Sequence, residues 1–265
     1  DFKKFKNSVK NYLKKRNLYA LQLLSAYHLA FSQNACNFSV PGSGKTSIVY
    51  GAYAYLKNLP ENDIKKVDCI LIIGPLSSFY PWKKEYEECF GKLPTIKKIH
   101  GNDSVSEKIN YFYSKNVKEL TFISYQGIIS LKDDIKNFLK NNKVMVILDE
   151  AHKIKNIEGG IIANSVLDLS KECKSRVVLT GTPLPQGYED LVNLYSFIWP
   201  NKNIIGFNKY QLKEMSKNVG DSRIKQLIKS VSPFFLRIKK SDLNLPKKRE
   251  KIISVEMGDI QKKIY

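Results

Sequence analysis

The sequence has no hydrophobic run that could cross a membrane, since none approaches the roughly 18 apolar residues that a spanning helix needs. The lysine-rich residues 1–16 also lack the apolar stretch of a secretory signal. These absences argue against a membrane protein, so we expect no membrane partner. The chain has 265 residues, of which 43% are hydrophobic, which is enough to bury a substantial core.

Cysteine is also scarce, because the chain has only four: Cys36, Cys69, Cys89 and Cys173. None forms a Cys-x-x-Cys pair, and none accompanies histidines at the spacing of a metal site. The sequence therefore predicts neither a disulfide framework nor a zinc site. Two of the cysteines lie in predicted strands, and we expect buried free thiols in a reducing compartment.

Arginine contributes only five of the 44 basic residues, and the rest are lysine. With 25 acidic residues the formal net charge is +19, which favours a polyanionic partner bound in a salt-sensitive way. An excess of lysine, asparagine and isoleucine also follows from an AT-rich genome. Only part of the charge is therefore evidence for a polyanion.

Apolar runs recur along the chain and alternate with helix-like segments. They span residues 69–73, 121–124, 144–148, 177–180 and 252–255. This alternation is typical of an α/β fold, with a mostly parallel sheet and helices on both faces.

A glycine-rich segment spans residues 39–46, Ser-Val-Pro-Gly-Ser-Gly-Lys-Thr. Gly42 and Gly44 permit a tight path with positive φ, so that backbone N–H groups can surround phosphate oxygens. Lys45 can reach the β- and γ-phosphates, and the hydroxyl of Thr46 can bind Mg²⁺. The pattern predicts a loop for nucleotide phosphates.

The context of this loop fits the same hypothesis. Residues 36–40 form a plausible strand, and residues 47–56 are compatible with a helix whose N-terminus would face the phosphates. Ser39 stands where the strict spacing has a glycine, so the match is to a looser form. A surface turn beside a helix cap is the alternative.

The second chemical signal is an acidic pair, Asp149 and Glu150, directly after the all-apolar run 144–148. Such a run predicts a strand buried on both faces, and open parallel sheets place their chemistry at the carboxyl ends of strands. Asp149 would hold Mg²⁺ and Glu150 would polarise an attacking water. A solvated acidic turn is the alternative.

An ordered series of motifs covers nearly the whole chain. It comprises Gln22, residues 70–77 with Trp82 and Glu85, residues 121–125, 149–156, 179–184 and 191–200, residues 235–237 with 245–247, and Gln261 with Tyr265. The series resembles helicase-like superfamily 2, specifically the Swi/Snf-type double-stranded DNA translocases. Two of its parts distinguish this group from generic helicases: the Ile-Lys-Asn sequence at residues 154–156 and the Leu-Thr-Gly-Thr-Pro sequence at residues 179–183.

The chain departs from that family at three places. The family usually has Asp-Glu-Met-Gly-Leu-Gly-Lys-Thr at residues 39–46, and residues 185–187 replace a stretch that often carries Asn. Only Arg237 remains of a pair of arginines. These differences suggest a divergent branch from a prokaryotic or viral source, and hence a cytoplasmic protein, or a nuclear one if the source is eukaryotic.

The resemblance implies a domain plan. Residues 1–245 would form an N-terminal RecA-like ATP-binding lobe, with a helical or irregular insertion at about 200–235. Residues 246–265 would begin the connection to a second RecA-like lobe that the chain lacks. Since that lobe supplies arginine fingers in the family, we expect this chain to bind ATP weakly and hydrolyse it poorly.

The resemblance and the motifs together assign roles. Catalysis falls to Lys45, Asp149 and Glu150, and Mg²⁺ to Thr46 and Asp149. The predicted nucleotide-binding residues are Gln22, Pro41, Gly42, Ser43, Gly44, Lys45, Thr46 and Ser47. Coupling is predicted for His152, Thr180, Gly181 and Thr182, and nucleic-acid backbone contacts for Pro75, Leu76, Ser77, Ser124 and Tyr125.

Some roles stay open. Trp82 is better explained as a core anchor than as a functional residue, and Thr180 could merely cap a strand. The basic cluster 245–249 is either a solvated linker or a DNA contact.

The leading hypothesis is an ATPase that uses ATP and Mg²⁺ to translocate on duplex DNA without reading its sequence. A strand-separating helicase on RNA or DNA is a close rival. A third hypothesis is an interaction module that binds nucleotide but does not hydrolyse it.

Overall fold

The structure is a computed structural model that describes residues 1–155, 160–243, 253–254 and 258. The predicted strand 252–255 falls partly outside this range, and its described residues, Ile253 and Ser254, are exposed and not in a strand. Asn156, the basic cluster 245–249, Gln261, Tyr265 and most of the predicted connection 246–265 also lie outside the described residues.

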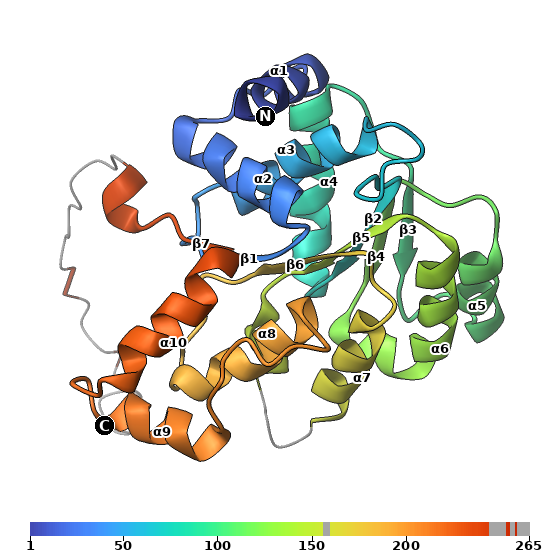
Figure 1. Cartoon of the computed structure of the whole chain (residues 1–265). Coiled ribbons are helices and arrows are strands. Elements are labelled where there is room, and N and C mark those ends of the chain that lie inside the picture. The colour runs from blue at the N-terminus through green and yellow to red at the C-terminus, as the bar shows by residue number, and fades with distance from the viewer. Residues whose placement is uncertain (156–159, 244–252, 255–257, 259–265) are drawn as a thin grey trace.

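In the described ranges seven strands form one sheet in the order β3-β4-β2-β5-β6-β1-β7, and every neighbouring pair is parallel (Figure 1). The strands are β1 (Asn34–Asn37), β2 (Cys69–Ile73), β3 (Ile96–Ile99), β4 (Leu120–Ile123), β5 (Val144–Leu148), β6 (Ser175–Leu179) and β7 (Phe235–Leu236). The apolar runs predicted four of them, β2, β4, β5 and β6, and the plausible strand 36–40 before the glycine loop corresponds to β1. β3 and β7 were missed, because β3 carries two lysines and β7 has only two residues.

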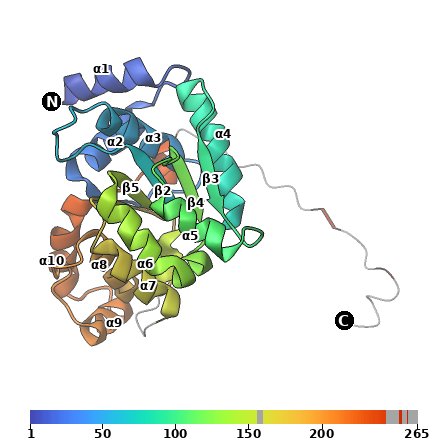
Figure 2. The same ribbon diagram turned by 90° about the vertical axis from the view of Figure 1, so that its right-hand side faces the viewer.

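Ten α-helices cover both faces of this sheet in the described part of the chain (Figures 1 and 2). They are α1 (Phe2–Tyr12), α2 (Ala20–Ser32), α3 (Lys45–Lys57), α4 (Phe79–Phe90), α5 (Val105–Tyr113), α6 (Tyr125–Asn141), α7 (Ile161–Ser170), α8 (Leu191–Ile198), α9 (Lys209–Lys217) and α10 (Arg223–Val231). The α/β prediction with helices on both faces is confirmed.

Alternate strand residues feed two separate cores. Ile70 and Ile72 pack with the side chains of α1–α4, whereas Leu71 and Ile73 pack with those of α5–α10 on the opposite face. Figure 1 shows these two layers above and below the sheet. A strand whose side chains are buried on both sides must be apolar throughout, which explains the unbroken apolar runs of the sequence.

The region 200–235, predicted as an insertion, contains α9 and α10. Both helices are amphipathic and place Leu212, Met215, Leu227 and Val231 in the core of their face. The four cysteines are buried free thiols, as the sequence predicted. Within the described ranges, none of the helices has the length and apolar character to cross a membrane.

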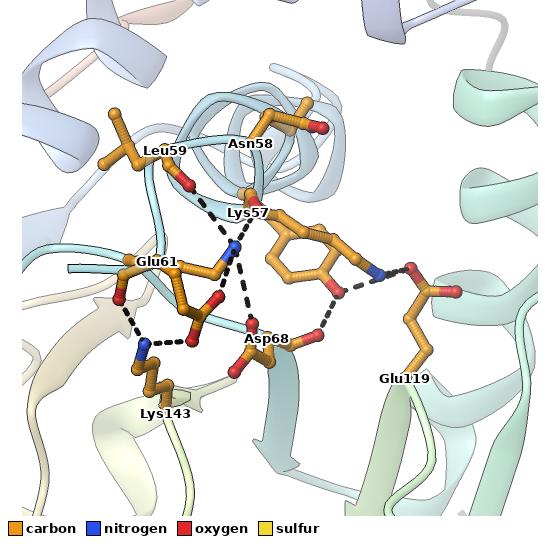
Figure 3. Close-up of polar contacts among 10 residues, drawn as sticks. Lys57, Asn58, Leu59, Glu61, Asp68, Glu119 and Lys143 are labelled. Carbon is orange, nitrogen blue, oxygen red and sulfur yellow. Dashed lines mark hydrogen bonds and ion pairs between the residues drawn. The ribbon is translucent and has the colours of Figure 1, made fainter. Parts of the chain in front are cut away.

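The strand register decides where functional groups can meet. Ile73 is paired with Leu148, and Asn37 with Leu179, so the strands end together along one edge. The residues that follow these strands therefore share the carboxyl edge of the sheet. At the opposite, amino edge, lysines and carboxylates from the chain around Lys57 and from the starts of β2, β4 and β5 form an ion-pair cluster (Figure 3).

Candidate functional site

The glycine-rich loop links β1 to α3 at the carboxyl edge. Gly42 and Gly44 have φ of 80° and 82°, a left-handed region that suits glycine, and Gly44 is the N-cap of α3. A Cβ at Gly44 would clash with the side-chain amide of Gln22. The ammonium of Lys45 donates to the carbonyl of Ser39 over 3.1 Å. The two glycines thus shape a concave turn with a lysine folded across it.

The loop offers donors that the described protein does not satisfy itself. The hydroxyl of Ser43 is buried and has no hydrogen-bond partner. The first N–H groups of α3, from Lys45 to Ser47, have no acceptor within the helix, and the helix dipole adds positive potential there. The hydroxyl of Ser47, in contrast, donates to Glu85, so only its backbone remains for a ligand. This arrangement fits phosphate oxygens.

Asp149 follows β5 and is only 8% exposed. Its Oδ2 accepts a hydrogen bond from the indole of Trp82 at 2.9 Å, and its carbonyl accepts one from the hydroxyl of Tyr125 at 2.8 Å. Its backbone N–H donates to Ile73 in β2. Two elements therefore fix the backbone of Asp149, and a third, through Trp82, bonds to its carboxylate. Trp82 is the predicted core anchor, at 1% exposure, but it is also a hydrogen-bond donor to the site.

Glu150 has a left-handed backbone, with φ and ψ both at 50°. For a residue with a Cβ this conformation costs free energy, and such strain is concentrated at functional positions. Its carboxylate is 41% exposed, and Oε2 lies 3.3 Å from His152 Nδ1 without hydrogen-bond geometry. The turn after β5 therefore holds an accessible carboxylate in a strained position.

Lys45 and the acidic pair lie within one electrostatic environment. Burial lowers the pKa of Lys45 from its usual value, while the charges of Glu150 and Asp149 raise it. β6 separates β1 from β5 in the sheet, yet both loops reach over the same edge. The structure thus brings together the three residues that the sequence predicted to act jointly.

The turn after β6 lies against the phosphate loop. A Cβ on Gly181 would come within 3.0 Å of the Pro41 ring, so a larger residue there would push on the loop. Thr180 is fully buried, and its backbone N–H donates to the carbonyl of Asn37 over 3.2 Å. Its hydroxyl oxygen accepts a hydrogen bond from the N–H of Thr182. Of the predicted coupling residues, Gly181 therefore lies next to the loop and Thr180 is bonded to the end of β1, whereas His152 lies on the turn with the acidic pair.

Gln22 bridges α2 and the loop. Its side-chain amide donates to the carbonyl of Ser43 at 3.0 Å, and its Oε1 accepts from the N–H of Tyr19. Beside it is a cavity of about 490 Å³. The lining residues are Tyr19, Ala20, Leu21, Gln22, Gly42, Ser43, Ile238, Asp242 and Leu243. Sequence reasoning found Gln22 but missed Tyr19 and the three residues after β7, which come from more than 190 positions away.

A second cavity, of about 420 Å³, lies at the ends of β2 and β4. It is lined by Gly74, Pro75, Leu76, Ser77, Ser124, Tyr125, Gln126, Lys153 and Ile162. We call it the β2–β4 groove. All five residues predicted to contact nucleic acid are in it, although Tyr125 is buried and its hydroxyl is used by Asp149. The sequence analysis assigned no role to Lys153, although it belongs to the motif 149–156 that contains the acidic pair.

Ser39, which differs from the residue that the family usually has at this position, connects the start of the loop to the segment after β7. Its buried hydroxyl accepts a hydrogen bond from the N–H of Ile238 at 2.9 Å. Phe38 donates to Leu236 and Val40 donates to Ile238 along the same pair of segments. The phosphate loop is therefore bound directly to the segment that follows β7.

The oxygen donors of the site suit magnesium. Mg²⁺ prefers oxygen ligands, keeps several waters, and is commonly shared between one or two protein groups and substrate phosphates. Thr46 and Asp149 could supply the protein oxygens. In the ranges described, no three His, Cys, Asp or Glu side chains cluster as a metal site, so phosphates and water would complete the coordination.

An all-parallel sheet with a phosphate loop after its first strand and an acidic pair after a neighbouring buried strand defines a RecA-like domain. The chain belongs to the SNF2-related domain family, whose model matches residues 38–265. The resemblance predicted from the motifs is thus confirmed.

Known proteins support this assignment. The ATP-dependent helicase FUN30 of Saccharomyces cerevisiae is 29% identical over 241 residues, covering 84% of this chain and 20% of the relative. An uncharacterized ATP-dependent helicase of Mycoplasma pneumoniae is 31% identical over 233 residues, with the same coverage. The chain therefore spans about a fifth of these relatives.

Two solved structures share the fold. The SWI2/SNF2 ATPase core domain of Sulfolobus solfataricus is 25% identical with a TM-score of 0.66, covering 89% of this chain and 47% of that one. The core in complex with dsDNA is 23% identical with a TM-score of 0.65 and the same coverage. The RecA-like fold prediction is confirmed by these matches.

Proposed function

We propose that this chain is the ATP-binding lobe of a DNA-dependent ATPase that translocates on double-stranded DNA. The observation that carries the proposal is the convergence of Lys45, Asp149 and Glu150 at one edge of the sheet, within each other's electrostatic influence. Membership of the SNF2-related family supports the same reaction, hydrolysis of ATP to ADP and phosphate.

In this proposal the residues act mainly by positioning and by stabilising charge. Lys45 and the N-terminus of α3 hold the phosphates, and Thr46 and Asp149 hold Mg²⁺. The bound ion would neutralise charge that develops on the phosphate oxygens. Glu150 orients a water for attack and accepts its proton, a task that suits an accessible carboxylate.

The base of the nucleotide would occupy the cavity beside Gln22. Its volume of about 490 Å³ falls within the usual range for small-molecule sites, and Gln22 offers both a donor and an acceptor for adenine. Asp242 and Ile238 close the same cavity from the segment after β7. We therefore add this segment to the predicted nucleotide-binding residues.

The DNA backbone would lie along the β2–β4 groove. Leu76, Ser77 and Lys153 are exposed there, and Tyr125 links the groove to the nucleotide site through its hydrogen bond to Asp149. A solved relative of the same fold binds dsDNA. Contacts of this kind position a protein on the duplex and carry no base sequence.

A second RecA-like lobe would complete the motor. This chain matches 47% of the solved ATPase cores, which leaves room for a lobe of similar size in the proteins it resembles. Assayed without such a lobe, residues 1–265 should bind ATP weakly and turn it over slowly, because arginine fingers from a second lobe would not be present.

Two substitutions test the proposal. Lys45→Ala should weaken ATP binding at least tenfold, and Glu150→Gln should keep binding but slow turnover about 100-fold or more. Lys98→Ala, an equal charge change on an exposed residue of β3, is the control for Lys45→Ala.

A separate experiment compares the nucleic acids. Turnover is measured with duplex DNA, single-stranded DNA and RNA, in the chain alone and joined to a second lobe. Stronger stimulation by RNA would favour a helicase, and no turnover in either form would favour an interaction module.

A further inference from the structure

Helix α4 lies between the β2–β4 groove and the nucleotide site. The short 3₁₀ turn Leu76–Ser78 in the groove leads without a break into α4. Trp82 and Glu85 are three positions apart on this helix, so they share one face. Both side chains bond to the nucleotide site, although they come from a helix that supplies none of its predicted ligands.

Trp82 determines how the Asp149 carboxylate is oriented. Its indole N–H donates to Oδ2 at 2.9 Å, while Oδ1 accepts the backbone N–H of Glu150 at 3.1 Å. Hydrogen bonds to a charged acceptor are stronger and more directional than neutral ones. With one bond on each oxygen, the carboxylate cannot rotate without losing one of them.

Glu85 makes hydrogen bonds on the other side of the site. Its carboxylate accepts from the hydroxyl of Ser47, the residue next to Thr46, and pairs with Arg16 at 3.3 Å. One side chain of α4 therefore bonds directly to the predicted Mg²⁺ ligand Asp149, and another bonds to Ser47, the neighbour in the chain of the predicted ligand Thr46. A single rigid helix spans the gap between the two halves of the metal site.

We infer that Trp82 is a positioning residue that orients Asp149 for Mg²⁺, with Glu85 fixing the opposite half of the site from the same helix. The inference rests on the proposed function, because it assigns a task to Trp82 only if nucleotide and magnesium bind there. Packing alone does not require an indole at this position, since the buried ring packs edge-on against Tyr50, a contact that needs no N–H donor.

The first test separates magnesium-dependent binding from binding in general. Trp82→Phe keeps an aromatic ring and removes the N–H donor. We expect the affinity for ATPγS to fall about tenfold in magnesium and to remain unchanged in EDTA, since a bond to a charged group is worth about one such factor or more. Calorimetric titration gives both values. Equal losses in the two conditions, or no loss, would overturn the inference.

Tyr50→Phe is the matched control. The Tyr50 hydroxyl donates to the carbonyl of Trp82 at 2.7 Å, and its ring packs edge-on against the indole. This substitution also removes one buried hydrogen bond at α4 but leaves Asp149 untouched. The ratio of affinities in magnesium and EDTA should equal that of the unmodified chain. A change in this ratio would show that any disturbance of α4 has the same effect.

A second measurement keeps Trp82 in place, in case its replacement prevents folding. The chain has two tryptophans, so Trp199→Phe makes Trp82 the sole indole emitter. ATPγS with magnesium should change its emission, whereas ATPγS in EDTA should not. Adding Asp149→Asn should abolish the response. Binding in magnesium without any change in emission would contradict the inference.

The two proposals fail in different ways. If Lys45→Ala binds ATPγS as well as the unmodified chain does, the nucleotide site itself is wrong. If Lys45→Ala binds weakly while Trp82→Phe matches the unmodified chain in magnesium, only the positioning role fails.

Discussion

The two edges of the sheet use charge in opposite ways. At the carboxyl edge Lys45, Asp149 and Glu150 come close without neutralising one another in ion pairs of the described structure, and the backbone of Glu150 is strained. At the amino edge the charges of the ion-pair cluster are satisfied by one another (Figure 3). One sheet therefore supports a site that awaits a ligand and a cluster that stabilises the fold.

The amino-edge cluster shows what a completed network looks like. The ammonium of Lys66 donates to the carbonyl of Lys57 at 2.9 Å and lies within 4 Å of Glu61 and Asp68. Lys143 donates to the carbonyl of Glu61 at 2.6 Å and pairs with its carboxylate (Figure 3). Each cation thus has more than one acceptor, and the loop after α3 is tied to the start of β5.

The carboxyl edge has buried polar atoms without hydrogen-bond partners. The hydroxyl of Ser43 and Nδ1 of His152 are buried without hydrogen-bond partners, although buried polar groups are nearly always paired. Such atoms are explained if a ligand supplies the partner. Buried atoms without partners also occur elsewhere in the described chain, for example the indole nitrogen of Trp199, so the guide to function is their coincidence with the glycine-rich loop and the strained acidic turn.

The largest effect should come from Glu150→Gly. Glycine removes the carboxylate that, in the proposed function, orients the attacking water, so turnover should fall about 100-fold or more. It also accepts a φ of 50° without strain, so the free energy of unfolding should rise by about 0.5–1 kcal/mol. Turnover assays and urea unfolding measure the two effects. A variant that is both inactive and less stable would show that the backbone there is relaxed.

Ser39→Ala should have the next largest effect, on stability. It leaves the N–H of Ile238 without its acceptor, and an unsatisfied buried donor costs about 1–3 kcal/mol. Urea unfolding gives the value. Ser106→Ala, the same change at an exposed position of α5, is the control and should have an effect within about 0.5 kcal/mol. A cost for Ser39→Ala no greater than that of the control would exclude the proposed bond.

Glu119→Gln tests the amino edge and should cost about 1 kcal/mol of stability at neutral pH, without changing ATP affinity. Burial is the largest single influence on the pKa of Glu119 and would raise it, but several favourable contacts, led by the hydrogen bond from Lys57, together outweigh burial and hold the pKa below the usual 4.5. The charged form therefore stabilises the fold above pH 4.5, and this contribution is lost as the pH falls through the lowered pKa.

Unfolding measured from pH 7 to pH 3 checks the sign of this effect. The difference in stability between Glu119→Gln and the unmodified chain should shrink steadily below pH 4.5. A difference that grows on acidification, or a loss of ATP binding at pH 7, would contradict the division between the two edges.

Much of the site was predictable because its signals are local. The glycine loop is contiguous, and the acidic pair directly follows an apolar strand, so their meeting at one edge follows from parallel topology. Whether these residues perform the predicted roles stays a prediction. The family and the RecA-like fold were predicted correctly for the same reason, since whole motifs carry them.

The remainder depends on tertiary structure. Nothing near Asp242 in the sequence indicates that it lines a cavity with Tyr19, since the two meet only because β7 pairs with β1. Trp82 has the composition of a core residue, and its bond to Asp149 depends on the packing of α4. The two residues of β7 are too few to give a strand pattern.

The pairing of β7 with β1 gives the phosphate loop a mechanical role. Because the two segments run parallel, tension on the chain beyond Leu243 is borne in shear by the bonds from Phe38 to Leu236 and from Val40 to Ile238. These bonds end one residue before Pro41. A pull transmitted along the chain would therefore reach the glycine-rich turn before it reaches either hydrophobic core.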